Sequence, residues 1–488
     1  MIPVLLIVIP LVSGLLAFLV KQEKSAKTWS LISSMATMVI AILGMAFLNK
    51  GAWLETNLPW LPELGSSFAV KMDGMSQLLC LLTGVAFPGI FIATWHATYR
   101  NAHNFHALML LMQAGLMGVF VAADALVFYF FWELALIPAY FLCSIWGGEK
   151  RIAVTFKFFI YTFLGSLFML IGIIWVYLQT ADHSFSIQSF YNANLPGKHQ
   201  GWVFWMMFLA FAIKIPIFPF HTWQPDTYEQ SPTAVTMVLS GVMVKMGVFG
   251  ILRWLIPIVP VGAWAWGDTV ATLCVVGMIY ASLVAIQQDD LKKLIAYSSI
   301  AHMGLMGLAI FVTSTVGIQG VLIQMFNHGV NIIGLWIVVE LIERQLGTRK
   351  ISELGGLAQK APTLAILLVV IALANVALPL TNAFVGEFMM FTGVFGSQAT
   401  KYSEVFMVIG GISIILSAVY TLNMIQRVFY GNTNNLTVAA KDIRFNEKLV
   451  LVVLVIGIIV MGVYPKPMIE ATKLAVDAIY SKMFVKLP

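Results

Sequence analysis

Four ionisable side chains lie inside long apolar stretches of the sequence, where charge is costly. Glu133, Lys214, Lys245 and Glu387 occur in FFWELALIPAYFL, AFAIKIPIFPFHTW, VLSGVMVKMGVFG and LPLTNAFVGEFMMF. A charge at the centre of a membrane costs about 3 kcal/mol to insert, and such residues usually mark ion or proton pathways. Four of them together, at roughly 10 kcal/mol, indicate proton or ion transfer rather than a packing role.

Two histidines extend this set. His302 and His328 lie in SSIAHMG and QMFNHGV, and an imidazole can take up a proton on one nitrogen and release it from the other. A lone histidine in a helix is more often a packing residue, but the polar neighbours Ser298, Ser299 and Asn327 can hold water beside these two. The predicted site therefore consists of Glu133, Lys214, Lys245, His302, His328 and Glu387.

Glu133 and Lys214 are expected to form an ion pair if their helices touch. At about 4 Å and an effective dielectric near 20, such a pair is worth about 4 kcal/mol. The carboxylate stabilises the charged lysine, so moving or neutralising it would release a proton from Lys214. The alternative is a static pair that locks two helices together. For Lys245, the alternative is a side chain that extends to the membrane surface.

The composition predicts an all-α protein that crosses a membrane many times. Hydrophobic residues make up 60% of the 488 residues and charged residues only 10%, and apolar runs of about 20 residues follow one another throughout. The apolar start of the chain lacks a basic region before it, which favours a retained first span over a cleaved signal peptide. Cys80, Cys143 and Cys274 show no metal-binding spacing, and no glycine-rich phosphate loop is present. We therefore expect no metal, nucleotide or nucleic acid to bind this chain.

Hydropathy predicts about 14 spans. They lie near 2–20, 27–48, 72–95, 104–122, 124–146, 152–178, 202–221, 232–255, 264–286, 291–313, 316–343, 362–398, 403–426 and 447–465. The span at 362–398 is too long for one straight crossing and contains Pro379, so we expect a broken helix there. Prolines also crowd the end of the span at 202–221. Backbone interrupted at membrane depth is tolerated only where it faces protein or a wet cavity.

Basic residues are distributed unevenly between the two sets of predicted loops. Loops after odd-numbered spans hold Lys21, Lys24, Lys27, Arg100, Lys150, Arg151, Lys292, Lys293, Arg344, Arg349, Lys350, Lys360, Arg427, Lys441, Arg444 and Lys448. Loops after even-numbered spans hold only Lys50, Lys71, Lys198 and Lys401. The positive-inside rule then places the odd loops in the cytoplasm and both termini on the opposite, periplasmic side.

The spacing of the ionisable residues suggests an internal repeat. Glu133 and His302 are about 170 residues apart, and so are Lys214 and Glu387. Each pair is separated by five spans, an odd number, so the two repeats would be inverted, as in many transporters. This predicts two five-helix repeats, spans 4–8 and 9–13, each with a broken helix. The predicted divisions are residues 1–103 (spans 1–3), 104–255 (first repeat), 264–426 (second repeat), and 427–488 (span 14 and the tail).

Several stretches resemble one protein family in the same order along the chain. They are KIPIFPFHTWQPDTYEQSPTAVTMVLSGVMVKMGVFGILRW at 214–254, together with FFWELALIPAYFL, QDDLKKLIAYSSIAHMG, MFNHGVNIIGLW and LPLTNAFVGEF. They resemble the antiporter-like subunits of respiratory complex I, which are related to the multi-subunit sodium/proton antiporters. The resemblance covers nearly the whole chain. It implies that the six predicted site residues form the family's central proton-transfer axis.

Position 387 and the helix break before it distinguish this chain within the family. Most members carry lysine where this chain has Glu387, whereas the group designated M typically has glutamate. The usual break resembles SLGLPGxxGF, but here NVALPLTNAF has Ala377, Leu380 and Ala383 where glycines are usual. Glycine would loosen the break, so its loss implies a stiffer or less hydrated half-channel. Ser231 also stands where alanine is usual, with no evident consequence.

The resemblance implies a proton-translocating subunit of NADH:quinone oxidoreductase in a bacterial inner membrane. Its expected neighbours are the lipid bilayer and the other antiporter-like subunits, L and N. NADH, FMN, iron–sulfur clusters and quinone would bind in partner subunits, with no redox centre in this chain. The alternatives are a subunit of a multi-subunit sodium/proton antiporter and a non-pumping membrane anchor of a hydrogenase-type complex.

Overall fold

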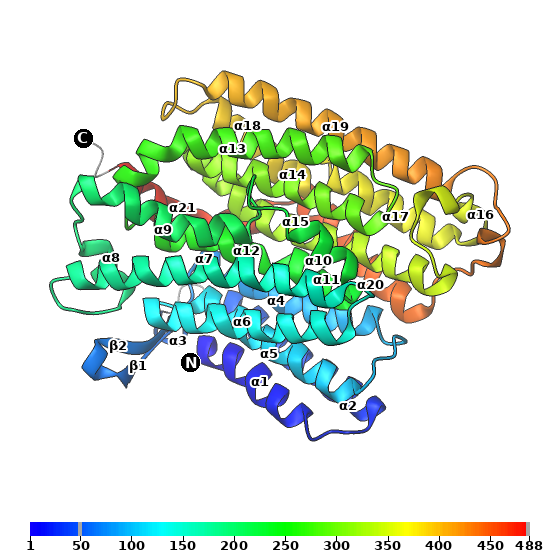
Figure 1. Cartoon of the computed structure of the whole chain (residues 1–488), viewed down its shortest axis with the longest axis horizontal. Helices are drawn as coiled ribbons and strands as arrows, with labels where there is room; N and C mark the ends of the chain where they lie inside the picture. Colours follow the sequence, from blue (N-terminus) through cyan, green and yellow to red (C-terminus); the bar gives the residue numbers. More distant parts are fainter. Residues whose placement is uncertain (47–50, 485–488) are drawn as a thin grey trace.

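The molecule is a bundle of helices that run approximately side by side, here described by a computed structural model for residues 1–46 and 51–484 (Figure 1). In this part of the chain, eleven helical stretches are long and apolar enough to cross a membrane. They are α2 (Glu23–Ala46), α4 (Gly74–Ala93), α5 (Ala102–Val121), α6 (Ala125–Trp146), α7 (Arg151–Gln179), the stretch Thr233–Leu255, α13 (Pro260–Ile286), α14 (Leu291–Phe311), α15 (Thr315–Leu346), α19 (Ser403–Phe429) and α20 (Phe445–Val463). The predicted multi-pass membrane protein is confirmed.

Three further predicted spans coincide with helices that are shorter, less apolar or interrupted. These are α1 (Ile2–Ala17), α9 (Gly197–Lys214), and the pair α17 (Pro362–Asn375) and α18 (Asn382–Phe395). Fourteen crossings and the inverted repeat therefore stay predictions. The last two residues of the predicted span 27–48, and Lys50, lie outside the described residues.

The remaining elements are short or lie at the ends of the bundle. The helices are α3 (Gly51–Leu54), η1 (Pro62–Leu64), α8 (Ile187–Asn192), α10 (Gln224–Gln230), η4 (Ile351–Glu353), α16 (Leu357–Lys360), η5 (Thr437–Ala439) and α21 (Lys466–Phe484). The strands β1 (Glu55–Leu61) and β2 (Ser66–Lys71) form an antiparallel hairpin, with Glu55 opposite Lys71. The predicted fold class is confirmed in that the described chain is mostly helical, and this hairpin, which joins two predicted spans, is an addition to it.

The predicted broken helix at 362–398 is confirmed. Helix α17 ends at Asn375 and α18 begins at Asn382, with Pro379 between them. Ala377 and Leu380 have φ angles of 57° and 73°, which is the left-handed region that favours glycine. Two of the three positions where the family resemblance leads us to expect glycine therefore have a glycine-like backbone, although they carry side chains. The third position, Ala383, lies within α18.

The predicted span at 232–255 is less regular than a single α-helix. It consists of α11 (Thr233–Val238), the π-helix η2 (Leu239–Met243), α12 (Lys245–Gly250) and the π-helix η3 (Ile251–Leu255). The hydropathy pattern predicts the length of this span but not its two π turns. Single π turns inside helices occur often at functional sites.

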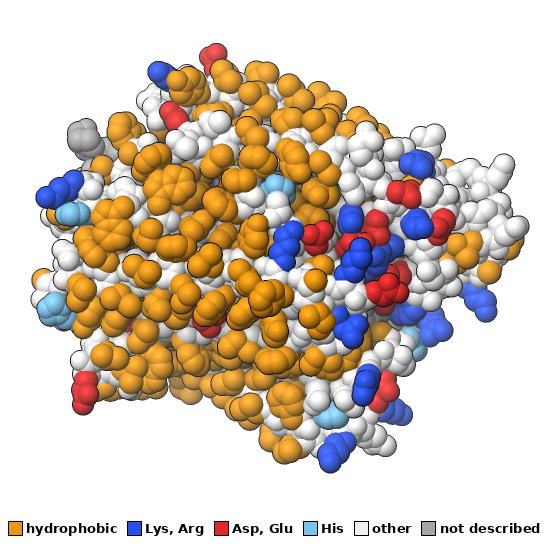
Figure 2. All heavy atoms as spheres, in the orientation of Figure 1, with side chains coloured by type: hydrophobic (Ala, Val, Ile, Leu, Met, Phe, Trp, Pro, Cys, Tyr) orange, Lys and Arg blue, Asp and Glu red, His pale blue; other side chains and the backbone are white. Residues whose placement is uncertain are grey.

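The two ends of the bundle differ in charge. A wide apolar surface covers the face in view, and basic and acidic side chains gather at one end, on the right of Figure 2. At this end Arg349 bonds to Asp290 at 2.5 Å, to Glu343 at 2.9 Å and to Glu229 at 3.3 Å. Partial burial opposes its charge, but the contacts with Asp290 and Glu343 raise the pKa of Arg349. The hairpin, the start of α1 and the end of α21 lie toward the opposite end (Figure 1).

Candidate functional site

The centre of the site is a contact between two buried side chains from α12 and α15. The amino group of Lys245 lies 2.8 Å from Nδ1 of His328, and it also donates to the carbonyl oxygen of Ser240 at 2.8 Å. Lys245 is fully buried and His328 nearly so. Because Lys245 has only donors when charged, this geometry requires Nδ1 of His328 to be the acceptor, which places the ring proton on Nε2.

The irregular helix explains how Lys245 reaches these partners. In the π turn the N–H of Val244 donates to the carbonyl of Leu239, five residues earlier, at 3.2 Å. Glycines bring α15 close to the same turn, because a Cβ on Gly241 would lie 2.7 Å from Ile333 and one on Gly329 would lie 2.8 Å from the Gly241 carbonyl. Larger residues at either position would move His328 away from Lys245.

Helix α14 continues the polar path beyond His328. The Nε2 atom of His328 lies 3.4 Å from the Ser299 hydroxyl, and the rings of His302 and His328 have centroids 5.7 Å apart. Among the described residues, no direct hydrogen bond joins the rings of His302 and His328. The serine hydroxyl, or a water molecule beside it, has to complete the connection.

The path ends at Glu387 in α18, just after the helix break. Its Oε1 atom lies 3.1 Å from Nδ1 of His302 and accepts from Nε2 of Gln324 at 3.2 Å. Glu387 is only 3% exposed. A Cβ on Gly386 would lie 2.5 Å from the Gln324 side chain, so this glycine permits the close contact between α15 and α18.

Three site residues were missed by the sequence reasoning. Asn375, the last residue of α17, lies 3.3 Å from Nε2 of His302 and donates to Ser298 at 3.2 Å. The hydroxyl of Tyr420 donates to Ser298 at 2.9 Å. The third is Gln324, which contacts Glu387. Buried amides in the apolar contexts VLIQMF and ALANVAL were the available signal for Gln324 and Asn375; Tyr420 gave none.

A small cavity lies beside Glu387 and His302. Its volume of about 10 Å³ is close to the room that one water molecule needs. It is lined by Met278, Ala301, His302, Leu305, Glu387, Ser413, Ile414 and Ser417. The Ser413 hydroxyl lies 3.2 Å from that of Ser282 in α13. Glu387 can therefore exchange its proton with a water on the side of α19.

The predicted ion pair between Glu133 and Lys214 is not formed in this structure. Lys214 is 1% exposed, and its amino group, without a hydrogen-bond partner in the described part of the chain, lies 5.5 Å from the Trp132 ring and 5.9 Å from the Phe158 ring. Glu133 is half-buried beside Ser166, near enough for its charge to act on Lys214. Aromatic rings occupy the space around the ammonium group, so they replace the expected direct contact.

The structure thus gathers four of the six predicted residues into one network and leaves two apart. Lys245, His328, His302 and Glu387 are connected in that order. Lys214 is the last residue of α9, where the following prolines end the helix, and α9 packs against α12. A Cβ on Gly247 would lie 2.6 Å from Ile215, so the Lys214 and Lys245 segments are in close contact.

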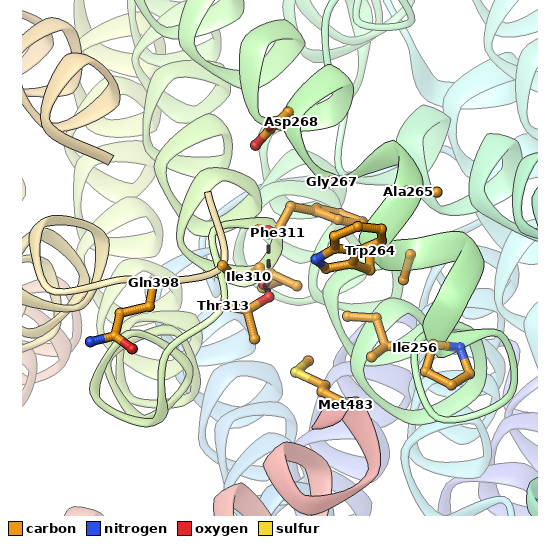
Figure 3. Close-up of a pocket in the computed structure, with 13 residues that line it drawn as sticks. Ile256, Trp264, Ala265, Gly267, Asp268, Ile310, Phe311, Thr313, Gln398 and Met483 are labelled. Atoms are coloured by element: carbon orange, nitrogen blue, oxygen red, sulfur yellow. Dashed lines mark hydrogen bonds between the residues drawn. The ribbon is translucent and has the colours of Figure 1, made fainter. Parts of the chain in front are cut away.

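A larger pocket lies away from this network. Its volume is about 270 Å³, and it lies where α13 begins and α14 ends, near the loop after α18. Figure 3 shows mostly apolar side chains around it, including Trp264 and Met483, with Asp268 and Gln398 toward its edges. None of the six predicted site residues lines this pocket, so its size does not identify it as the site.

Comparisons with known proteins show which family and which solved structures this chain resembles. The family described as NADH:quinone oxidoreductase/Mrp antiporter, TM, matches residues 122–417. NADH-quinone oxidoreductase subunit M of Rickettsia typhi is 34% identical over 490 residues, covering 98% of each chain. F(420)H(2) dehydrogenase subunit M of Methanosarcina mazei is 33% identical, covering 96% of each. A chain of respiratory complex I from Thermus thermophilus with bound NADH has a TM-score of 0.92 at 28% identity, covering 99% of this chain and 100% of that chain.

Proposed function

Since this chain belongs to the NADH:quinone oxidoreductase/Mrp antiporter family, as a member of its subunit M group, we propose that it carries protons across the membrane in such a complex. The observation that carries the proposal is the buried network from Lys245 through His328 and His302 to Glu387. Each member can gain and lose a proton. Lys245 contacts His328 directly, and His302 contacts Glu387 directly, whereas the two histidines are neighbours with the Ser299 hydroxyl beside them. A static core has no need of four titratable groups in a row.

The contacts support a sequence of proton transfers. Lys245 donates its proton to Nδ1 of His328, while the proton on Nε2 of His328 leaves toward Ser299. His302 takes up that proton on one nitrogen and releases another from Nδ1 to Glu387. The net result is the movement of one proton, and each histidine ends neutral with its ring proton on the other nitrogen. Rotation of the ring restores the starting tautomer before the next transfer.

Glu133 and Lys214 supply the control of this path. Their charges act on each other without direct contact, so a change at Glu133 alters how firmly Lys214 holds its proton. Lys214, at the end of α9, lies next to the segment that carries Lys245, because α9 packs against α12. The lysine can therefore pass a proton, or its electrostatic effect, to Lys245.

The wider arrangement follows the family. We place fourteen crossings and two inverted repeats in the membrane, with the charged end in the cytoplasm and both termini on the periplasmic side of a bacterial inner membrane. The antiporter-like subunits L and N are its neighbours. NADH, FMN, iron–sulfur clusters and quinone bind in partner subunits, whose electron transfer drives this chain.

A specific alternative to NADH as the electron donor comes from one of the relatives. The relative from Methanosarcina mazei is named as a subunit of F(420)H(2) dehydrogenase and is nearly as similar as the NADH-quinone relatives. A sodium/proton antiporter subunit is the less favoured alternative, because Glu387 stands where those relatives typically have lysine. A hydrogenase-type anchor would not need the buried charges.

Purification of the complex that contains this chain tests the proposal. We expect NADH-driven quinone reduction and acidification of inverted membrane vesicles, both lost when Lys245 is changed to alanine in a complex that still assembles. Sodium/proton exchange without electron transfer would support the antiporter alternative instead. Full pumping by assembled Lys245→Ala would overturn the proposed role of the network.

A further inference from the structure

A second set of buried polar groups lies outside the network, on helix α5. His106 is 5% exposed and Gln113 is fully buried, and all four of their side-chain polar atoms are without hydrogen-bond partners in the described part of the chain. A buried polar group without a hydrogen-bond partner destabilises the folded protein. Such groups are therefore satisfied by water when the surroundings have room for it.

These two residues share a face of α5 with a residue that contacts the Lys245 helix. His106, Gln113 and Phe120 are seven residues apart, so they lie on one face of α5. The ring of Phe120 has its centroid 5.6 Å from that of Phe249 in α12, and α5 packs against α12. The same face therefore turns toward the helix that carries Lys245.

The depth of Gln113 matches that of the Lys245 amino group. Gln113 lies seven residues before Phe120, a rise of about 10 Å. The Lys245 amino group turns back to the carbonyl of Ser240, nine residues before Phe249 and so about 13 Å away along the helix. Both helices begin at the charged end of the bundle, so the two groups lie at nearly equal depth.

The other end of this face reaches a wide pocket at the charged end. The pocket has a volume of about 790 Å³ and is lined by residues that include Tyr99, Arg100, Lys150, Thr233 and Glu340. The ring of Tyr99 has its centroid 6.4 Å from that of His106. Lys27 and Glu23 of α2 are the charged groups near His106. His106 thus lies directly behind the wall of the pocket.

Helix α2 adds polar groups to the same region. It packs against both α4 and α5, and the buried hydroxyls of Ser30 and Ser33 also have no partner among the described residues. Ser30 lies one turn after Lys27, which is held at the charged end by bonds to the carbonyls of Trp95 and Ala97. Unpartnered polar atoms therefore lie on two neighbouring helices, α2 and α5, inward from the charged end.

We propose that water held by His106 and Gln113 carries protons from this charged pocket to Lys245. A proton from the pocket binds one ring nitrogen of His106 and another leaves from the second nitrogen, so the histidine ends neutral. Gln113 does not titrate and orients the water that passes the proton to the Lys245 amino group. This inference rests on the proposed function, and it identifies where protons reach the network.

The test uses His106→Phe and Gln113→Leu in the assembled complex in inverted vesicles. Both changes replace an unpartnered polar group by an apolar one of similar size, so a purely structural role predicts unchanged or higher stability and normal pumping. We expect proton pumping to fall about tenfold, the effect of about 1.4 kcal/mol on a rate-limiting step. His106→Gln, which can still hold water, should retain more activity than His106→Phe and replaces it if that variant fails to assemble.

The control variants separate the possible failures. His103→Phe changes a partly exposed histidine on the same helix and should pump normally. Lys245→Ala should be inactive if the proposed function is right. Inactive Lys245→Ala with normal pumping in both His106→Phe and Gln113→Leu would overturn the water path alone. Normal pumping in Lys245→Ala would overturn the proposed function, and the water path with it.

Discussion

The amino group of Lys245 lies 2.8 Å from Nδ1 of His328, although 83 residues separate the two in the sequence. The contact joins the only lysine of the network to its first histidine. It requires a π turn in one helix and glycines in both, so the fold contains features that serve this contact. The two residues are expected to act as one unit.

Removal of either partner should therefore cost nearly as much as removal of both. Lys245→Met and His328→Leu should each reduce proton pumping by at least about tenfold, and the double variant should be little worse, because residues that act together are not additive. Pumping is measured as the initial rate of vesicle acidification per quinone reduced. Additive losses in the double variant would show that the two residues work in separate steps.

Replacement of Glu133 should impair pumping without preventing assembly. Because Glu133 makes no ion pair with Lys214, Glu133→Gln leaves no newly broken contact at the lysine, yet it removes the charge that acts on it. We expect Glu133→Asp to retain more pumping than Glu133→Gln, and Lys214→Ala to be as impaired as the glutamine variant. The amount of complex in the membrane is measured alongside. Equal loss in Glu133→Asp and Glu133→Gln would mean that geometry governs this position.

Glu387 tests the end of the path. Glu387→Gln keeps the size of the side chain but removes its proton, so it should assemble and lose most pumping. Glu387→Lys should retain some activity, because Gln324 has an unpartnered Oε1 that can accept from a lysine, and His302 can present an acceptor nitrogen. Vesicle acidification and quinone reduction are compared for both variants. Full pumping by Glu387→Gln would remove this residue from the path.

The helix break allows two stability predictions of opposite sign. Leu380→Gly relieves a left-handed backbone and should stabilise the protein by up to about 1 kcal/mol. Gly462→Ala should destabilise it by about 1–3 kcal/mol, because the new Cβ would lie 2.3 Å from the Leu380 carbonyl oxygen. The midpoint of thermal unfolding of the purified complex measures both. A lower midpoint for Leu380→Gly would show that its exposed side chain stabilises the break.

The sequence drew attention to these residues because charge inside an apolar stretch is conspicuous. Lys214, Lys245 and Glu387 stand out in apolar stretches whatever their contacts are, and His302 and His328 follow from polar neighbours. The broken helix at 376–381 was equally predictable, since proline prevents a regular backbone there. Asn375 and Gln324 were within reach of the same reasoning, because amides in such stretches are also costly.

Only the tertiary structure decided which of these groups meet. Glu133 and Lys214 looked like a pair by charge, but Trp132 and Phe158 fill the space around the ammonium group. Lys245 meets His328 because of a π turn that periodicity cannot reveal. The hydropathy of a segment depends on its own residues alone, whereas a contact depends on how glycines and large side chains on separate helices fit together. The apolar context of these groups was therefore readable from the sequence, and the order in which they contact one another was not.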